Sequence, residues 1–215
     1  MLEMESRIYL LSGFTPLLGS QPPAPDVRTQ YLASKATPEA AAEEEALTPD
    51  LDEKNLTVFL RDPDKNDRLI IMDYVVRGFL KEAFMSLKAQ VGVGNARSKI
   101  DRYVFVEPRR IPIRKDGKAV FDEDDYFERP IRCQTMQGER VTLTGSEQIY
   151  DPWQIKVRIT LLPNTGTAKS EAVTWDKIES ALDYGRFLGL GQFRTGSYGR
   201  FTWTRIEEEK EEKTA

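Results

Sequence analysis

The stretch Gly189-Leu190-Gly191-Gln192-Phe193-Arg194-Thr195-Gly196-Ser197-Tyr198-Gly199-Arg200-Phe201 lies between a helical pattern and a final strand pattern. Its glycines allow tight turns and leave backbone N–H groups open to a ligand. Arg194 and Arg200 add positive charge beside these donors. The combination predicts a structured loop that holds an anion such as a phosphate. A tight turn with no ligand is the alternative.

Composition favours a single domain with a hydrophobic core. The 215 residues are 40% hydrophobic and 31% charged, which is enough for one globular core. We expect one domain over residues 1–206, a long surface insertion at 20–55, and an acidic disordered tail at 207–215. The net charge of -4 does not suit a uniformly basic nucleic-acid binder, but acidic residues gather in the insertion and the tail.

The chain has no histidine and a single cysteine, Cys133. The lack of histidine excludes Ser–His and Cys–His pairs, histidine general bases and the common zinc sites. We therefore expect no catalytic residue, no metal and no cofactor. Cys133 fits a small buried residue in a reducing cytoplasm. Neither a signal peptide nor a span of about 20 apolar residues occurs, so we expect a cytoplasmic protein without a membrane partner.

The order of the predicted elements indicates an α+β fold. Apolar positions at helical spacing between Asp73 and Leu87 predict one helix, and Thr174 precedes a second. Strands are predicted at 7–11, 56–60, 69–72, 103–106, 141–144, 155–161 and 198–206, and a hairpin at 111–121 has Asp116-Gly117 at its tip. Without the insertions the order is strand, helix, strand, strand, helix, strand. This order is typical of a ferredoxin-like (RRM-like) antiparallel sheet with two helices on one face.

Three separated stretches resemble the RAMP superfamily, the ferredoxin-like RNA-binding proteins of CRISPR effector complexes. They are Gly13-Phe14-Thr15-Pro16-Leu17-Leu18-Gly19-Ser20 after the first strand, Val76-Arg77-Gly78-Phe79-Leu80-Lys81-Glu82-Ala83 in the first helix, and the glycine loop 189–201. The resemblance covers roughly residues 7–206. The chain departs from the family pattern at Glu82, where the family often has glycine, and in the spacing of the glycine loop.

The resemblance implies roles for several residues. In the family the helix element contacts RNA, so Arg77 and Lys81 are expected to do so here; the alternative is that they form ion pairs on the helix surface. Some family members cleave RNA with an aspartate after the first strand, which makes Asp26 the position to test for metal-dependent cleavage. The closing Tyr198–Phe201 motif is also similar to small phage-encoded proteins of this kind.

Two further segments concentrate positive charge. Residues 95–118 hold eight basic residues and three acidic ones, threaded with Tyr103 and Phe105, which either stack on bases or belong to the core. Residues 128–140 carry Arg and Gln side chains with planar donors, or form an exposed hairpin edge. The consecutive acids at 122–125 fit a solvated hairpin tip better than a metal site.

These patterns together nominate a set of residues that bind RNA or a nucleotide. The set is Arg77, Lys81, Arg97, Lys99, Arg109, Arg110, Arg129, Arg132, Gln134, Gly189, Gly191, Arg194, Gly196, Tyr198, Gly199 and Arg200.

The sequence leaves three functional hypotheses open. The first is a non-catalytic RNA-binding protein, a subunit or modulator of a CRISPR-like or phage ribonucleoprotein. The second is a phage-type protein that sequesters a small nucleotide or cyclic oligonucleotide. The third is an oligomeric structural assembly protein. RNA is thus the expected partner, a small nucleotide is the alternative, and a homo-oligomer or protein complex is expected in each case.

Overall fold

The computed structural model describes residues 4–28, 43, 45–49, 55–135, 138–163 and 171–207. It has a mixed α/β architecture in which antiparallel pairing predominates. Within these ranges no helix is long and apolar enough to cross a membrane.

Four strands form the central part of the main sheet, in the order β13-β1-β12-β6. Each pair of neighbours is antiparallel. The strands are β1 (Glu5–Gly13), β6 (Val104–Glu107), β12 (Gln154–Leu161) and β13 (Phe201–Ile206). The predicted strands at 7–11, 103–106 and 155–161 are therefore present, while the last strand begins at Phe201 and not at Tyr198.

Alternation of residue type decides which face of this sheet is buried. In β12 the side chains of Ile155, Val157 and Ile159 are fully buried, whereas the intervening Lys156 and Arg158 are exposed. Successive side chains of a strand point to opposite faces, so the apolar set turns toward one layer and the charged set toward solvent. The sheet consequently has one packed face and one open face.

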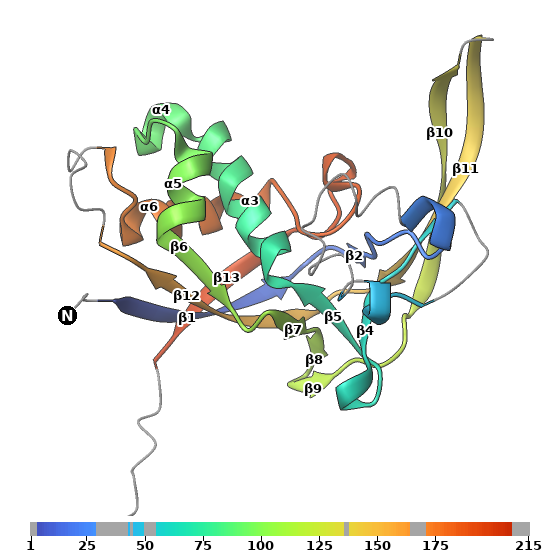
Figure 1. Ribbon diagram of the computed structural model, residues 1–215, viewed down its shortest axis with the longest axis horizontal. Coiled ribbons are helices and arrows are strands. Elements are labelled where there is room, and N and C mark those ends of the chain that lie inside the picture. The colour runs from blue at the N-terminus through green and yellow to red at the C-terminus, as the bar shows by residue number, and fades with distance from the viewer. Residues whose placement is uncertain are drawn as a thin grey trace, which may run out of the picture.

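Helices cover the packed face (Figure 1). They are α3 (Asp73–Ser86), α4 (Lys88–Val91), α5 (Ala96–Tyr103) and α6 (Trp175–Asp183). Phe79, Leu80 and Phe84 of α3 share one core with Ile178 of α6 and Phe201 of the sheet. The helices predicted after Asp73 and Thr174 are present, and α5 lies beside α3 as an element the sequence analysis does not predict.

The helix predicted between Asp73 and Leu87 is followed by a second, short helix. Helix α3 stops at Ser86, and the short helix α4 follows before Gly92 takes a left-handed conformation with φ 64°. Gly92 therefore ends α4, because a residue without Cβ adopts this conformation at little cost.

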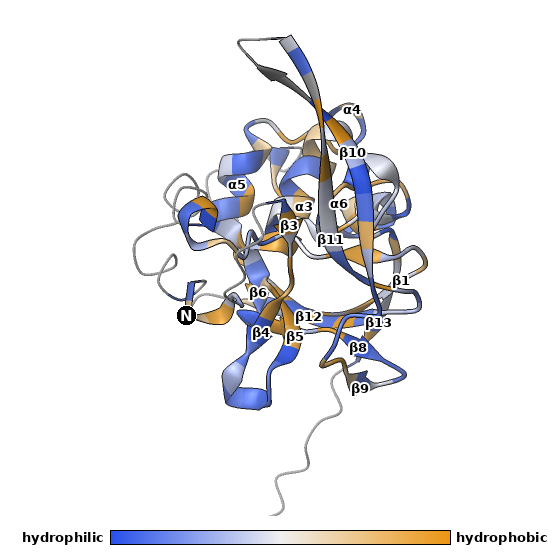
Figure 2. Ribbon diagram, turned by 90° about the vertical axis from the view of Figure 1, so that its right-hand side faces the viewer, coloured by the Kyte–Doolittle hydropathy of each residue, from blue (hydrophilic) through white to orange (hydrophobic). Residues whose placement is uncertain are grey.

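Two smaller sheets flank the main one. A hairpin of β10 (Asp125–Thr135) and β11 (Gly138–Ile149) projects from the body of the molecule (Figure 1), and both hydrophilic and hydrophobic residues lie along it (Figure 2). Its base pairs with β2 (Leu17–Leu18) and β3 (Leu56–Thr57). The other sheet consists of β4 (Leu60–Asp62), β5 (Arg68–Met72) and β7 (Arg110–Pro112), with the 3-10 turn η1 (Pro63–Lys65) between β4 and β5. The predicted strand 56–60 is thus divided between β3 and the start of β4, and the predicted hairpin at 111–121 appears as β8 (Arg114–Lys115) and β9 (Lys118–Ala119).

Part of the predicted insertion at 20–55 packs against the three-stranded sheet. Leu47 packs with Leu60, Ile70 and Met72. Residues 45–47, within this insertion, are helical. The predicted tail lies beyond the described residues from position 208 onward.

Truncation of a core side chain of β12 tests the packed face. We expect Ile159→Ala, at a fully buried position, to lower the free energy of unfolding by about 2–5 kcal/mol, since it removes buried methyl groups and leaves a cavity. Thr204→Ala, at an exposed position of β13, is the control and should change it by less than about 0.5 kcal/mol. Urea unfolding followed by circular dichroism measures both. Equal, small effects would contradict the assignment of the buried face.

Candidate nucleic-acid interface

The glycine loop packs its backbone directly against the segment after β1. Gly199 donates its N–H to the carbonyl of Pro16 at 2.7 Å, and Gln192 donates to the carbonyl of Leu18 at 3.3 Å. The N–H of Arg200 is bonded to the Thr15 hydroxyl at 2.8 Å. Two of the three stretches that carry the family resemblance are therefore joined side by side in the structure.

The loop glycines are required by these close approaches. A Cβ atom at Gly189 would lie 1.9 Å from the carbonyl oxygen of Tyr198, and one at Gly199 would lie 2.0 Å from that of Leu190. Gly191 and Gly199 also have positive φ angles of 74° and 68°, which favour glycine. A Cβ at Gly196 would meet the ring of Phe193 at 2.2 Å. Packing within the fold thus accounts for all four glycines.

Several N–H groups expected to hold a phosphate are already used inside the loop. Leu190 donates to the carbonyl of Gly199, Gly196 to that of Phe193 and Ser197 to that of Arg194. Three more N–H groups of the loop, those of Gln192, Gly199 and Arg200, are bonded to residues 15–18. Fewer N–H groups are therefore left for a ligand. The direct phosphate cradle made by Gly189, Gly191, Gly196 and Gly199 remains a prediction, and side chains of the loop are the better candidates for contact.

An aromatic group around one arginine lies where the glycine loop meets the β10–β11 hairpin. The guanidinium of Arg129 is 3.5 Å from the ring centroid of Phe193. Phe127 lies 4.8 Å from Tyr198 between ring centroids, and Phe193 lies 5.7 Å from Tyr198 in a stacked geometry. We call Phe127, Arg129, Phe193 and Tyr198 the loop–hairpin cluster. All four side chains are partly exposed, so a ligand can reach them.

Arg129 carries a charge that is poorly compensated. Its Nε atom is buried and has no hydrogen-bond partner, and no ion pair to it is found in the part of the chain that the structure describes. Desolvation lowers the pKa of Arg129, with Tyr198 acting weakly in the opposite direction. A partly buried cation without a carboxylate costs free energy, and an anionic ligand that binds there reduces this cost.

The backbone of the loop is strained at the same place. Phe193 and Ser197 have φ angles of 51° and 72°, a region that side chains other than glycine seldom adopt. Such strain persists where surrounding structure imposes it and is common at ligand sites. In this loop it turns the ring of Phe193 over Arg129.

The remaining candidates on the loop and hairpin differ in environment. The Nε of Arg200 is buried without a hydrogen-bond partner, as that of Arg129 is. Arg132 is 78% exposed and 3.6 Å from Glu139. Gln134 belongs to β10, but its side chain lies outside the described part of the structure.

The cations of α3 and the loop each face a carboxylate of the chain. Lys81 lies 2.5 Å from Asp101, Arg77 lies 3.3 Å from Asp73, and Arg194 lies 2.7 Å from Glu82. The Arg194–Glu82 pair joins the glycine loop to the family-like stretch of α3. At least one side chain of each pair is partly exposed. Exposed ion pairs contribute little free energy, so another anion can replace the carboxylate in each pair.

Gly78 stands out among the residues of α3. A Cβ atom there would meet nothing within 4 Å, so packing inside the chain does not require glycine. Glycine within a helix costs about 1 kcal/mol relative to alanine. The open surface at Gly78, close in sequence to Arg77 and Lys81, suits the near approach of a ligand backbone.

Arg109 and Arg110 join the insertion to the three-stranded sheet. Both contact Glu43, at 2.5 and 3.2 Å, and Arg110 also pairs with Asp62 and Asp64 at 3.1 and 2.8 Å. Hydrogen bonds from Arg110 to Asp64, Glu43 and Asp62 raise its pKa against the opposing effect of desolvation. Both arginines therefore face carboxylates of the chain in this structure, and their contact with RNA stays a prediction.

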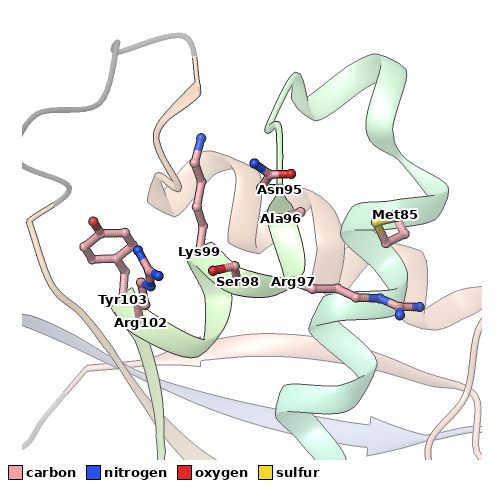
Figure 3. A pocket seen from close by; sticks show the side chains of 8 residues that line it. All are labelled: Met85, Asn95, Ala96, Arg97, Ser98, Lys99, Arg102 and Tyr103. Carbon is pink, nitrogen blue, oxygen red and sulfur yellow. The ribbon is translucent and has the colours of Figure 1, made fainter.

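The cations of α5 diverge from one another. Met85, Asn95, Arg97, Lys99, Arg102 and Tyr103 help to line a shallow pocket of about 570 Å³. Figure 3 shows Arg97 and Arg102 pointing away from each other and Lys99 extending away from both. Lys99 also binds Glu171, at 3.0 Å to its carbonyl and 3.3 Å to its carboxylate. The arrangement does not focus the three charges on one point.

The described carboxylates considered for a metal ion have partners within the chain. Among the described residues no group of three or more Cys, Asp or Glu side chains is placed to hold a metal ion. Asp26 is exposed and its carboxylate accepts the N–H of Val27 at 2.9 Å. Asp124 and Asp125 bond with Lys115 and Tyr150 at the start of β10.

Comparisons with known proteins find structural likeness at a distant level. No family model and no curated protein matches the sequence. A chain in the cryo-EM structure of the Type III-B Cmr-beta bound to cognate target RNA aligns with a TM-score of 0.48 at 11% identity. The alignment covers 94% of this chain and 60% of that chain, so this chain spans less than two thirds of its length.

Two glycines with similar backbone angles test the packing of the loop. Gly199→Ala should lower the free energy of unfolding by about 2–5 kcal/mol, because it adds a steric clash to the left-handed strain. Gly117 has φ 77°, but a Cβ there would meet nothing within 4 Å, so Gly117→Ala should cost only about 1–2 kcal/mol. Chemical denaturation of both variants makes the comparison. A smaller loss at Gly199 than at Gly117 would contradict the close packing.

Proposed function

We propose that the protein is a non-catalytic, RAMP-like RNA-binding protein with a ferredoxin-like core, acting as a subunit or modulator of a CRISPR-like or phage ribonucleoprotein. The strand order β13-β1-β12-β6, with α3 and α6 on one face, supports the ferredoxin-like assignment. The meeting of the three family-like stretches around Arg194 and Pro16 supports the RAMP-like one.

Arg129 carries the functional part of the proposal. It is a partly buried cation without a carboxylate partner in the described chain, stacked on Phe193 and next to two more aromatic rings. Single-stranded RNA presents both the negative charge and the unstacked bases that such a cluster binds. In the proposed complex the guanidinium of Arg129 contacts a phosphate of the RNA, and Tyr198 or Phe127 stacks on a base.

The surface of α3 extends this contact. Gly78 permits close approach of the RNA backbone, and Lys81 and Arg194 exchange Asp101 and Glu82 for phosphates. Each exchange releases counterions, so affinity should fall steeply as salt rises.

Loss of the charge at Arg129 tests the proposal. We expect Arg129→Gln to weaken the binding of a labelled single-stranded RNA about tenfold, with a thermal midpoint close to that of the parent protein. Arg205→Gln, at an exposed position of β13, removes the same charge elsewhere and should weaken binding far less. Fluorescence anisotropy at low and moderate salt measures affinity. Equal affinities for both variants, or no RNA affinity of the parent at low salt, would refute this function.

Substitution of Gly78 separates folding from binding. Gly78→Ala should raise the free energy of unfolding by about 0.5–1 kcal/mol, since alanine is the better helix former and its methyl group meets no neighbour. The same methyl group should weaken RNA binding if the backbone of the RNA lies against α3. Paired denaturation and anisotropy measurements detect the opposite signs. A more stable variant with unchanged affinity would remove α3 from the interface.

A further inference from the structure

The open face of the main sheet contains a hollow that the proposed RNA interface does not use. It has a volume of about 440 Å³ and lies between β12 and the segments that pair with its two ends. Glu107 of β6 pairs with Arg158, and Arg114 of β8 pairs with Gln154. Between these two points no register pair covers the edge of β12 within the described strands.

Proline explains why the edge is left uncovered. Pairing of β6 with β12 stops at Glu107, directly before Pro108, because proline has no N–H to donate to the next strand. The chain then joins β5 through β7, where Pro112 is opposite Ile70, before it returns to β12 at Arg114. The detour leaves a recess with an apolar wall formed by Ile8, Pro108 and Pro112.

The charged side chains of the hollow are predominantly basic. Among the described residues that line it, Arg114, Lys156 and Arg158 are basic and Glu107 is acidic. Lys156 and Arg158 occupy the same face of β12, about 7 Å apart along the strand. The Nε atom of Arg114 is buried and has no hydrogen-bond partner, although its Nη1 donates to the carbonyl of Gly117 at 3.3 Å. In a chain of net charge -4, this is a local excess of positive charge.

An exposed aromatic ring lies on the same face of the sheet. Phe105 is 41% exposed and precedes Glu107 by two residues in β6, so the two side chains share a face. Its partner across the strands is Thr160, two residues from Arg158. A ring in this position gives a base a surface to stack on beside the cations.

We propose that this hollow and Phe105 form a second binding surface, for a single-stranded nucleic acid. Arg114, Lys156 and Arg158 contact consecutive phosphates, Phe105 stacks on one base, and the wall of Ile8, Pro108 and Pro112 receives a neighbouring base or sugar. The apolar wall and the stacking ring favour an unpaired strand, because the bases of a duplex are stacked on one another and unavailable. The surface is separate from the loop–hairpin cluster and does not require that cluster to bind RNA.

The test uses the double variant Lys156→Gln/Arg158→Gln, both of whose positions are exposed. We expect about tenfold weaker binding of a labelled single-stranded RNA, and a salt slope of log K that is smaller by about 1.4, the value for two phosphate contacts on a single strand. The control, Lys118→Gln/Arg205→Gln, removes the same charge at exposed positions outside the hollow. Single-stranded DNA of the same sequence, measured in parallel, shows whether the surface distinguishes the two sugars.

Two further measurements keep the test decisive. Phe105→Ala should weaken binding about fivefold or more through lost stacking, and ultraviolet cross-linking should attach RNA to the peptide that contains Phe105. If the double variant binds both nucleic acids as well as its control does, the surface is not a nucleic-acid site. The result can be told apart from that at Arg129. Weaker RNA binding by the double variant, but not by Arg129→Gln, supports this surface alone. The reverse result supports only the loop–hairpin cluster.

Discussion

Close backbone contact between the glycine loop and the segment after β1 is the constraint on which the rest of the arrangement depends. The bonds from Gly199 to Pro16 and from Arg200 to Thr15 hold the end of the chain against its beginning. They place β13 beside β1 and set the loop against the base of the hairpin, where Phe193 reaches Arg129. A side chain at Gly189 or Gly199 would keep the two segments apart.

Elements with regular apolar spacing could be predicted from the sequence, whereas others could not. In β12 apolar and charged residues alternate, and in α3 the apolar residues lie on one side. These patterns are enough to predict which side chains are buried. Helix α5 buries only Ala96 and Ile100, too few apolar residues to produce a helical pattern among its many charges. The long hairpin is predicted only in part: the strand expected at 141–144 lies within β11. Its full length is not predicted, since Val141 and Leu143 are 66% and 60% exposed and its strands are held by pairing with one another.

Some residues of the candidate site could be predicted from the sequence, but not the fact that they lie together. Arg129 and Tyr198 are nominated from the sequence, while Phe127 and Phe193 are not, although both are aromatic residues within nominated or adjoining segments. Only tertiary structure brings residues 127–129 to residues 193–198. Likewise, the ion pairs of Arg110 with Glu43 and Asp62 join positions far apart in sequence, so the sequence alone could not show that Arg110 has carboxylate partners within the chain.

The junction between the glycine loop and the segment after β1 also includes a buried tryptophan, whose fluorescence depends on its surroundings. Trp153 is fully buried, and its indole N–H donates to the carbonyl of Thr15 at 2.8 Å. A Cβ atom at Gly13 would lie 2.0 Å from its ring. Because Thr15 also bonds to Arg200 of the glycine loop, a rearrangement that breaks this bond changes the surroundings of the indole. The chain has three tryptophans, and the Trp153 part of the intrinsic fluorescence can follow the state of this junction without an attached dye.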